Sequence, residues 1–591
     1  MRLLAVTLLL LPLQLFASNL VISGYVRDAT SGEVLSAATL RLIGDENAQT
    51  QTNDFGFYSL SVPQGSYRLS VSRVGYTSWE SELFTLQADT TWQIKLELAG
   101  AIEEVVVTAD RAVNQLTTPI MGLSRVDVGE ISQVPVLFGE KDVLKTIQLL
   151  PGVMSGGEGS SQFFVRGGMG DQNLILLDGA TVFNASHLFG FFSTFNSDAI
   201  RDVDLYKGGQ PAQYGGRLAS VLDIRMLEGN NQKFHAAGGI GLIASRLKVE
   251  GPLVRDKASF MVSGRRTYAD LFLKLSSDPD INQSQLYFYD LNLKTNFQLN
   301  DKNTLYLSGY FGEDILGYAD VFRFGWGNSS ATLRWNHLLS NRLFSNTTAV
   351  YSDYDYQVDL LDENVDFVIA SSIRSANLKQ DFQFFSGNNQ SLRFGAEFRY
   401  QQIQPSEIIT GENASVNALH IEKQKGIETA AYISHEWDPL SWMDVIYGLR
   451  ATHFSRDDAE QTYLSAEPRL AFNFKLGRQS SIKTSYNRNS QFLHQLTNTT
   501  SSLPTDAWVL SSERVKPQLA DQYALGYYRN FSADLYEFSM EVYYKDMQNQ
   551  IDYRDAADLQ ANARVEEELV FGIGRSYGVE WYLKKQRGRW N

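Results

Sequence analysis

Ten residues, Leu291-Asn292-Leu293-Lys294-Thr295-Asn296-Phe297-Gln298-Leu299-Asn300, show the pattern on which the fold of this chain depends. The odd positions are apolar apart from one threonine, and the even positions are all Asn, Lys or Gln. Strict alternation predicts a β-strand, because successive side chains of a strand point to opposite faces. One apolar face opposite one polar face is expected where lipid lies on one side and water or polar protein on the other.

The same alternation returns from Phe234 onward, for example over Leu392 to Tyr400, Arg469 to Leu476 and Tyr536 to Lys545. Short connections fall near 251–257, 301–303, 340–342, 386–390, 438–443, 477–480 and 531–534. Long ones fall between them, near 266–286, 312–328, 354–371, 403–425, 455–462, 490–519 and 548–566. Outer-membrane barrels are built this way, with short periplasmic turns and long outer loops. We therefore expect an antiparallel transmembrane β-barrel over 230–591; a soluble all-β protein is the alternative.

The predicted strands number about 15, and an odd number does not close an antiparallel barrel of the usual bacterial kind. Plugged outer-membrane transporters have about 22 strands. We therefore expect the barrel to be incomplete and the sequence to be truncated at its C-terminus by roughly seven strands. If so, further alternating strands are encoded directly downstream of codon 591.

Composition excludes several classes of function. The net charge of −15 disfavours nucleic acid as a partner, because phosphates need a basic face. The chain has no cysteine, so disulfides, cysteine-bound zinc and a lipidated N-terminal cysteine are excluded. His435-Glu436 lacks the second histidine of a zinc-protease motif, and Gly156 to Gly159 lacks the lysine of a phosphate loop. We expect no enzyme activity, no cofactor and no metal.

The N-terminal region has two parts. Met1 to Ala17 has the basic start, apolar run and small-residue end of an export signal, so 1–18 is predicted to be a signal peptide; an anchor or a buried strand is the alternative. Residues 19–99 contain short alternating strands separated by turns, which predict a β-sandwich. This region resembles the carboxypeptidase regulatory-like domain through Gly24-Tyr25-Val26, Thr52 to Tyr58 and Val74-Gly75-Tyr76.

Residues 119–229 combine a predicted amphipathic helix, Glu140 to Leu150, with short apolar strands and tight glycine turns. The turns contain Arg166-Gly167-Gly168, Asp178-Gly179, Lys207-Gly208 and Tyr214-Gly215-Gly216-Arg217. The linker 100–118 holds a strand-forming segment, Glu103-Glu104-Val105-Val106-Val107-Thr108-Ala109. A strand between domains has an unpaired edge that another protein can pair with.

Taken together, these motifs resemble a TonB-dependent outer-membrane receptor or transporter of the Bacteroidetes type, with a regulatory-like N-terminal domain. Further matches are Gln148 to Val153, Phe164 to Gly168, Ile175 to Gly179, Val203 to Gly208, Tyr214 to Leu218, Val249 to Leu253 and Tyr577 to Glu580. The resemblance implies a mainly β protein with an N-terminal sandwich in the periplasm, an α+β plug over 119–229 and the barrel in outer-membrane lipid. It also implies that Glu103 to Ala109 is a TonB box. The partners would be TonB with its inner-membrane energising complex and, as a candidate, a surface substrate-binding lipoprotein.

The implied function is energised uptake of a scarce, bulky nutrient such as a siderophore, a vitamin or an oligosaccharide. A passive porin and a surface signalling receptor are the alternatives. A porin needs neither a plug nor a TonB box. A carboxypeptidase-type enzyme is suggested only by the N-terminal domain, and no catalytic group of residues accompanies it.

Some side chains carry more specific expectations. Arg166 and Arg217 are expected to point at acidic residues of the barrel wall and to lock the plug there. The segment Phe183 to Phe195, with His187 inside it, is expected to pack against the barrel wall; contact with substrate is the alternative. Aromatic girdles at the lipid boundary are expected to include Tyr351, Tyr354, Tyr356, Trp437 and Trp442. The substrate-binding residues are not identified by the sequence.

Overall fold

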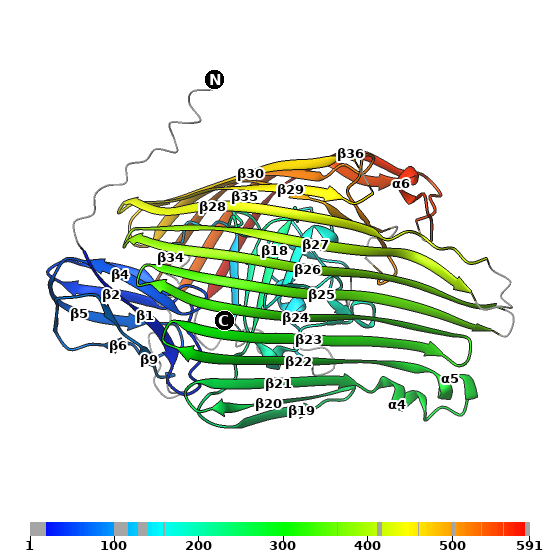
Figure 1. Cartoon of the computed structure of the whole chain (residues 1–591), viewed down its shortest axis with the longest axis horizontal. Coiled ribbons are helices and arrows are strands. Elements are labelled where there is room, and N and C mark those ends of the chain that lie inside the picture. The colour runs from blue at the N-terminus through cyan, green and yellow to red at the C-terminus, as the bar shows by residue number, and fades with distance from the viewer. Residues whose placement is uncertain are drawn as a thin grey trace, which may run out of the picture.

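The structure is a computed structural model that describes residues 19–99, 116, 118–127, 140–157, 160–362, 365–410, 417–458, 460–497, 503–532, 535–559 and 561–585. The predicted signal peptide and the segment Glu103 to Ala109 lie outside the described residues. A large curved sheet encloses a smaller unit, and a separate sandwich lies at one end of the sheet (Figure 1). The predicted mainly β fold, with sandwich, plug and barrel sheet, is confirmed.

The N-terminal sandwich consists of two sheets. One has the order β4-β1-β8 with β9 beside β1, and the other has the order β3-β2-β5-β6 with β7 beside β5. Alternation explains the core, since Tyr67, Leu69 and Val71 of β5 are buried while Arg68 between them is exposed. The strands are β1 (Leu20–Asp28), β2 (Thr39–Gly44), β3 (Ala48–Gln51), β4 (Phe57–Val62), β5 (Gly65–Ser72), β6 (Trp79–Glu80), β7 (Phe84–Leu86), β8 (Thr90–Thr91) and β9 (Ile94–Leu96).

The plug is built on a mixed sheet of order β10-β17-β18-β13-β14. The predicted helix is present as α3 (Val143–Ile147), which begins after Asp142, whose carboxylate accepts a hydrogen bond from the Lys145 amide at 3.0 Å. The sheet strands are β10 (Leu123–Asp127), β13 (Asn173–Leu177), β14 (Ala180–Thr181), β17 (Ile200–Tyr206) and β18 (Ser220–Met226). Short elements complete the plug: β11 (Val153–Ser155), β12 (Phe163–Val165), η2 (Gly170–Gln172), β15 (Ser186–His187), η3 (Leu188–Gly190), β16 (Phe192–Ser193) and η4 (Ser197–Ala199).

The barrel sheet has 16 strands in antiparallel sequence order, where the sequence predicted about 15. Its edge strands are β19 and β36, and the hairpin β32–β33 leaves the sheet between β31 and β34. The strands are β19 (His235–Ile240), β20 (Ala244–Val254), β21 (Ala258–Thr267), β22 (Gln285–Asn300), β23 (Asn303–Tyr318), β24 (Phe322–Ser340), β25 (Leu343–Asp362), β26 (Val365–Gly387), β27 (Gln390–Thr410), β28 (Gln424–Leu440), β29 (Met443–Arg456), β30 (Thr462–Lys475), β31 (Ser480–Gln491), β32 (Leu493–Leu496), β33 (Ala507–Leu510), β34 (Gln518–Phe531), β35 (Tyr536–Tyr553) and β36 (Leu569–Lys585).

The alternation in β22 is inverted relative to a soluble protein. Leu291 and Leu299 are exposed on the outer face, whereas Asn292 and Lys294 are buried toward the plug. The polar residues therefore line the lumen and the apolar residues face outward, as a membrane barrel requires.

The predicted short turns are confirmed, and they all lie at one end of the sheet, which we call the turn side. Two predicted loops at the opposite end, the loop side, are wrong. Residues 312–328 and 354–371 belong largely to β23, β24, β25 and β26. Tyr318 pairs with Phe322 between β23 and β24, and Asp362 pairs with Val365 between β25 and β26. Outward-facing Asp353 and Asp355 end the apolar alternation and thereby suggested a loop. Strand β25 nevertheless continues past that point. Its 20 residues span about 65 Å, whereas the apolar band of a barrel is about 25 Å tall, so a polar part of the strand extends beyond the band.

The remaining helices are short and lie in connections: α4 (Ala269–Leu273), α5 (Pro279–Gln283) and α6 (Val565–Glu568). No helix in the described part of the chain has both the length and the apolar character to cross a bilayer.

Candidate functional site

Arg166 joins the plug to the barrel wall. It follows β12 and is buried, and its Nη2 lies 2.5 Å from Glu541 Oε2 on β35. Its Nε lies 2.7 Å from Glu580 Oε1 on β36, and Lys207 Nζ lies 2.9 Å from Glu580 Oε2. Buried charges need such partners, because an unpaired one is strongly destabilising. The two plug cations and two barrel carboxylates therefore form one lock, the Arg166 lock.

Glycines bring the plug close to the wall. Gly167 has φ +68°, and a Cβ there would lie 2.3 Å from Ser576 Oγ of β36. A Cβ on Gly215 would lie 2.3 Å from Arg450 Nε of β29. Side chains at these positions would separate plug and wall, so the glycines allow the close approach of the two. Gly168, Gly179, Gly208 and Gly216 also lie in plug turns beside other side chains.

Asp178 forms a second contact between the plug and the barrel wall. Its Oδ2 lies 3.0 Å from Lys294 Nζ of β22, and its Oδ1 accepts a hydrogen bond from the Met226 amide at 3.1 Å. Arg334 of β24 donates from Nη2 to the Asp178 carbonyl oxygen at 3.0 Å. The Asp178-Gly179 turn is therefore both a tight turn and an anchor for two barrel cations.

The expectation for Arg217 is wrong. Its Nη1 donates to the carbonyl oxygens of Gly216, at 3.0 Å, and Leu493, at 3.4 Å, instead of to a carboxylate of the wall. The wall near this turn neutralises its own acids, since Arg450 Nη2 lies 2.8 Å from Glu397 Oε2. Tyr214 donates to Asp223 within the plug at 3.1 Å.

The segment Phe183 to Phe195 divides into two parts. His187 packs against the wall, with Nδ1 2.6 Å from Asp314 Oδ2 and its ring stacked on Phe288 at 4.0 Å between centroids. By contrast, Phe189 has φ 56° and is half exposed, and its ring lies 4.8 Å from that of Trp326. The predicted packing against the barrel wall is therefore confirmed for His187, while Phe189 faces the lumen on the loop side.

An aromatic cavity of about 80 Å³, the loop-side chamber, lies between the plug and the loop-side segment, which comprises residues 492–497 and 503–517. Phe183 meets Trp508 of β33 edge to face at 6.1 Å. Tyr354 of β25 donates to the Pro504 carbonyl at 2.8 Å and accepts from Asn184 of the plug at 3.3 Å. This buried position corrects the prediction of a lipid girdle for Tyr354, and Tyr356 is buried likewise. Tyr351 and Trp442 are exposed on the outer face.

Asp506 is a buried charged group of the same loop segment. Its Oδ2 accepts a hydrogen bond from the Leu503 amide at 2.9 Å. Burial raises the pKa of Asp506 to about 6, because the packed loop removes water from the carboxylate. The sequence analysis identified neither Asp506 nor Trp508. For Tyr354 a signal was available, because its even-numbered position lies on the polar face of β25, which faces the lumen.

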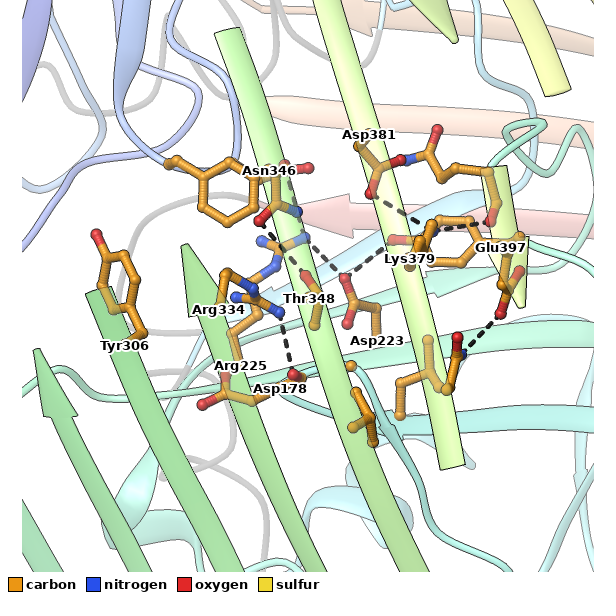
Figure 2. Close-up of a pocket in the computed structure, with 18 of the residues that line it drawn as sticks. Asp178, Asp223, Arg225, Tyr306, Arg334, Asn346, Thr348, Lys379, Asp381 and Glu397 are labelled. Atoms are coloured by element: carbon orange, nitrogen blue, oxygen red, sulfur yellow. Dashed lines mark hydrogen bonds and ion pairs between the residues drawn. The ribbon is translucent and has the colours of Figure 1, made fainter. Parts of the chain in front are cut away.

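A second, charged cavity of about 140 Å³ lies deeper, between the plug sheet and β24–β27 (Figure 2). Arg225 of β18 lies at its plug side, with Nη1 2.7 Å from Asp202 Oδ1 and Nη2 2.6 Å from Asp204 Oδ2. We call this space the middle cavity. Its labelled lining residues are Asp178, Asp223, Arg225, Tyr306, Arg334, Asn346, Thr348, Lys379, Asp381 and Glu397. Both signs of charge line it, which suits polar contents.

A larger space of about 780 Å³, the turn-side vestibule, lies between the sandwich, the plug and the turn-side part of the wall. Within the described ranges, no three His, Asp or Glu side chains gather into a group that could hold a metal ion.

Comparisons with known proteins complete this description. Residues 21–99 match the carboxypeptidase regulatory-like domain, 122–221 the TonB-dependent receptor plug domain, and 264–591 the TonB-dependent receptor-like β-barrel. The chain is 28% identical over 232 residues to the vitamin B12 transporter BtuB of Vibrio vulnificus (strain YJ016), which is 37% of this chain and 36% of that protein. The match thus spans about a third of the length of that relative.

Two solved structures share the fold. The siderophore receptor PirA from Acinetobacter baumannii has a TM-score of 0.58 at 16% identity, over 82% of this chain and 80% of that chain. The copper transporter OprC has a TM-score of 0.60 at 14% identity, over 80% of this chain and 77% of that chain.

Proposed function

From the premise that the chain belongs to the TonB-dependent receptors, as the match over 264–591 shows, we propose that it takes up a scarce, bulky nutrient across the outer membrane by an energised route. The observation that carries the proposal is the Arg166 lock, which fixes a folded plug inside the barrel sheet. Because the plug occupies the lumen, a passive porin is disfavoured, and passage requires work on the plug.

The segment Glu103 to Ala109 is our candidate for the TonB box. TonB, with its inner-membrane energising complex, would pair with it as an added strand and pull on the plug. A plug with short strands and many turns is a suitable element to yield, because such regions open at low free-energy cost. In this proposal the turn side and the sandwich lie in the periplasm and the loop side lies at the cell surface. A surface substrate-binding lipoprotein is a candidate further partner.

The relatives and the cavities support the proposed substrate class. Similar proteins named as a vitamin B12 transporter, a siderophore receptor and a copper transporter support a chelate or a vitamin, and an oligosaccharide fits the same architecture. The aromatic loop-side chamber supports first contact with rings or apolar faces, and the charged middle cavity supports polar groups deeper in. Family members are transporters and receptors rather than enzymes.

Deletion of Val105 to Thr108 tests the proposal. Cells that express the deleted chain should bind cyanocobalamin or a ferric siderophore at the surface as the parent does, and should lose uptake that depends on the proton gradient. Uptake that persists after the deletion, or after collapse of the gradient, would contradict the proposal and favour a porin.

A further inference from the structure

We propose that the Asn53–Phe55 turn of the N-terminal sandwich is the exit gate of a transport passage that runs beside β25, β26 and β27. The inference rests on the proposed function, because it assigns a route and a gate to that transport.

The route of the passage is indicated by residues that line two neighbouring cavities. Thr181, on the outer strand β14 of the plug sheet, lines both the loop-side chamber and the middle cavity. Strand β14 lies directly against β24 and β25 of the wall. Five residues line both the middle cavity and the turn-side vestibule: Asn53, Asp54, Gln213, Gln383 and Arg393. The three spaces therefore adjoin in series from the loop side to the turn side.

The gate lies where the sandwich reaches into this series of cavities. Asn53 Nδ2 donates to Gln383 Oε1 of β26 at 3.2 Å. Phe55 stacks on Phe344 of β25 at 5.4 Å, and the Arg334 guanidinium lies 5.3 Å above the Phe55 ring. A single turn thus contacts three neighbouring strands of the wall at the boundary between the middle cavity and the vestibule.

Asp54 ties the gate to the plug. Its Oδ1 lies 3.7 Å from Arg225 Nη2, and its side chain keeps about a third of its surface exposed. Arg225 retains Asp202 and Asp204 as closer, buried partners. Departure of Asp54 would therefore leave no unpaired charge on the plug, so the gate can leave at a modest free-energy cost. Nearby Arg225 and Arg393 outweigh the effect of burial and hold the pKa of Asp54 below its usual value, so the gate carries a charge.

The rest of the sandwich docks through a buried aromatic cluster, in which Phe57 packs against Phe344 at 5.6 Å and Phe385 at 5.7 Å, and through hydrogen bonds around it. The Ser61 amide donates to Asn388 Oδ1 in the β26–β27 turn at 2.6 Å. The Glu228 amide donates to Glu33 Oε1 at 3.0 Å, and the Asn231 amide donates to the Ser31 carbonyl at 2.8 Å. The sandwich also precedes the linker on which TonB would pull, so the same force would act on the gate and the plug.

The test uses the full chain, which has no cysteine and so accepts single reporter thiols. Asn346→Cys places a thiol on β25 in the middle cavity, and Gln461→Cys places a reference thiol on an exposed loop. The purified proteins in nanodiscs are treated with the small cationic thiol reagent MTSET, and the labelling rate is measured. The pair Asp54→Ala/Phe55→Ala removes the gate, and Glu82→Ala/Leu83→Ala is its matched control on an exposed part of the sandwich.

We expect gate removal to raise the labelling rate at position 346 roughly ten-fold or more, with the control pair and the reference thiol unchanged. Equal rates with and without the gate would overturn the proposal. If the gate pair does not fold, Asn388→Ala weakens docking from the barrel side, and the adjacent Asn389→Ala is its control. An unchanged rate for Asn388→Ala then overturns the proposal. The assay needs neither nutrient nor TonB, so a failure of the proposed function would show as uptake that persists after deletion of Val105 to Thr108, and not in these rates.

Discussion

Arg166 of the plug and Glu580 of the barrel form a buried, bidentate ion pair, with Nε 2.7 Å from Oε1 and Nη2 3.1 Å from Oε2. Glu580 also receives Lys207, so one barrel carboxylate serves two plug cations. This geometry makes Glu580 the position where a single change acts most strongly on the seating of the plug.

Glu580→Gln should therefore destabilise the seated plug by about 3–5 kcal/mol. The change removes the carboxylate partner of buried Lys207 and leaves buried Arg166 with Glu541 alone. Urea titration, followed by protease sensitivity of the plug, measures the change. Asp546→Asn is the matched control, since Asp546 pairs with Arg575 at 3.5 Å in an exposed position and should matter by about 1 kcal/mol or less. Similar losses for both variants would show that the lock has no special role.

Gly167→Ala should loosen the same seat for a steric reason. The residue has φ +68°, and the new Cβ would meet Ser576 Oγ at 2.3 Å. We expect a loss of about 1–3 kcal/mol in the same titration. Gly572→Ala on β36 has no atom within 4 Å of the new Cβ and should change stability little. A neutral Gly167→Ala would mean that plug and wall do not approach this closely.

Much of this architecture could be predicted from the sequence, because it follows from local rules. The alternation Leu291 to Asn300 defines a strand with one lipid face, and the position of Gly167 after Arg166 indicates a turn that presses against a wall. Tyr354 shows the limit. An aromatic residue near a strand end suits a lipid girdle, but its parity places it in the lumen, where Pro504 and Asn184 become its partners.

The docking of the sandwich could not be predicted in this way. The contact of Asp54 with Arg225 joins residues far apart in sequence, and neither belongs to a motif that names the other. The partner of Arg217 likewise depended on the position of Leu493 against the plug, which no local pattern indicates.

Tyr354→Phe should release the loop-side segment, at residues 503–517, from the plug. The change removes the hydrogen bond to the Pro504 carbonyl and the one from Asn184, a loss of about 1–2 kcal/mol. Faster cleavage of this segment by a protease added to intact cells measures it. Tyr351→Phe, on the exposed outer face, should leave cleavage unchanged. Equal cleavage of the two variants would contradict the assignment of Tyr354 to the lumen.

The packing of the same segment should depend on pH through Asp506. Burial raises the pKa of Asp506 from 3.8 to about 6, so the packed segment binds a proton that the released segment would not hold. The packed form is therefore favoured as pH falls from about 6 to about 4 and has no further dependence on this group above that range. Cleavage of the segment should slow over that interval, and Asp506→Asn should remove the slowing while Glu513→Gln, in an exposed position, keeps it. A pH dependence that survives Asp506→Asn would assign the effect to another group.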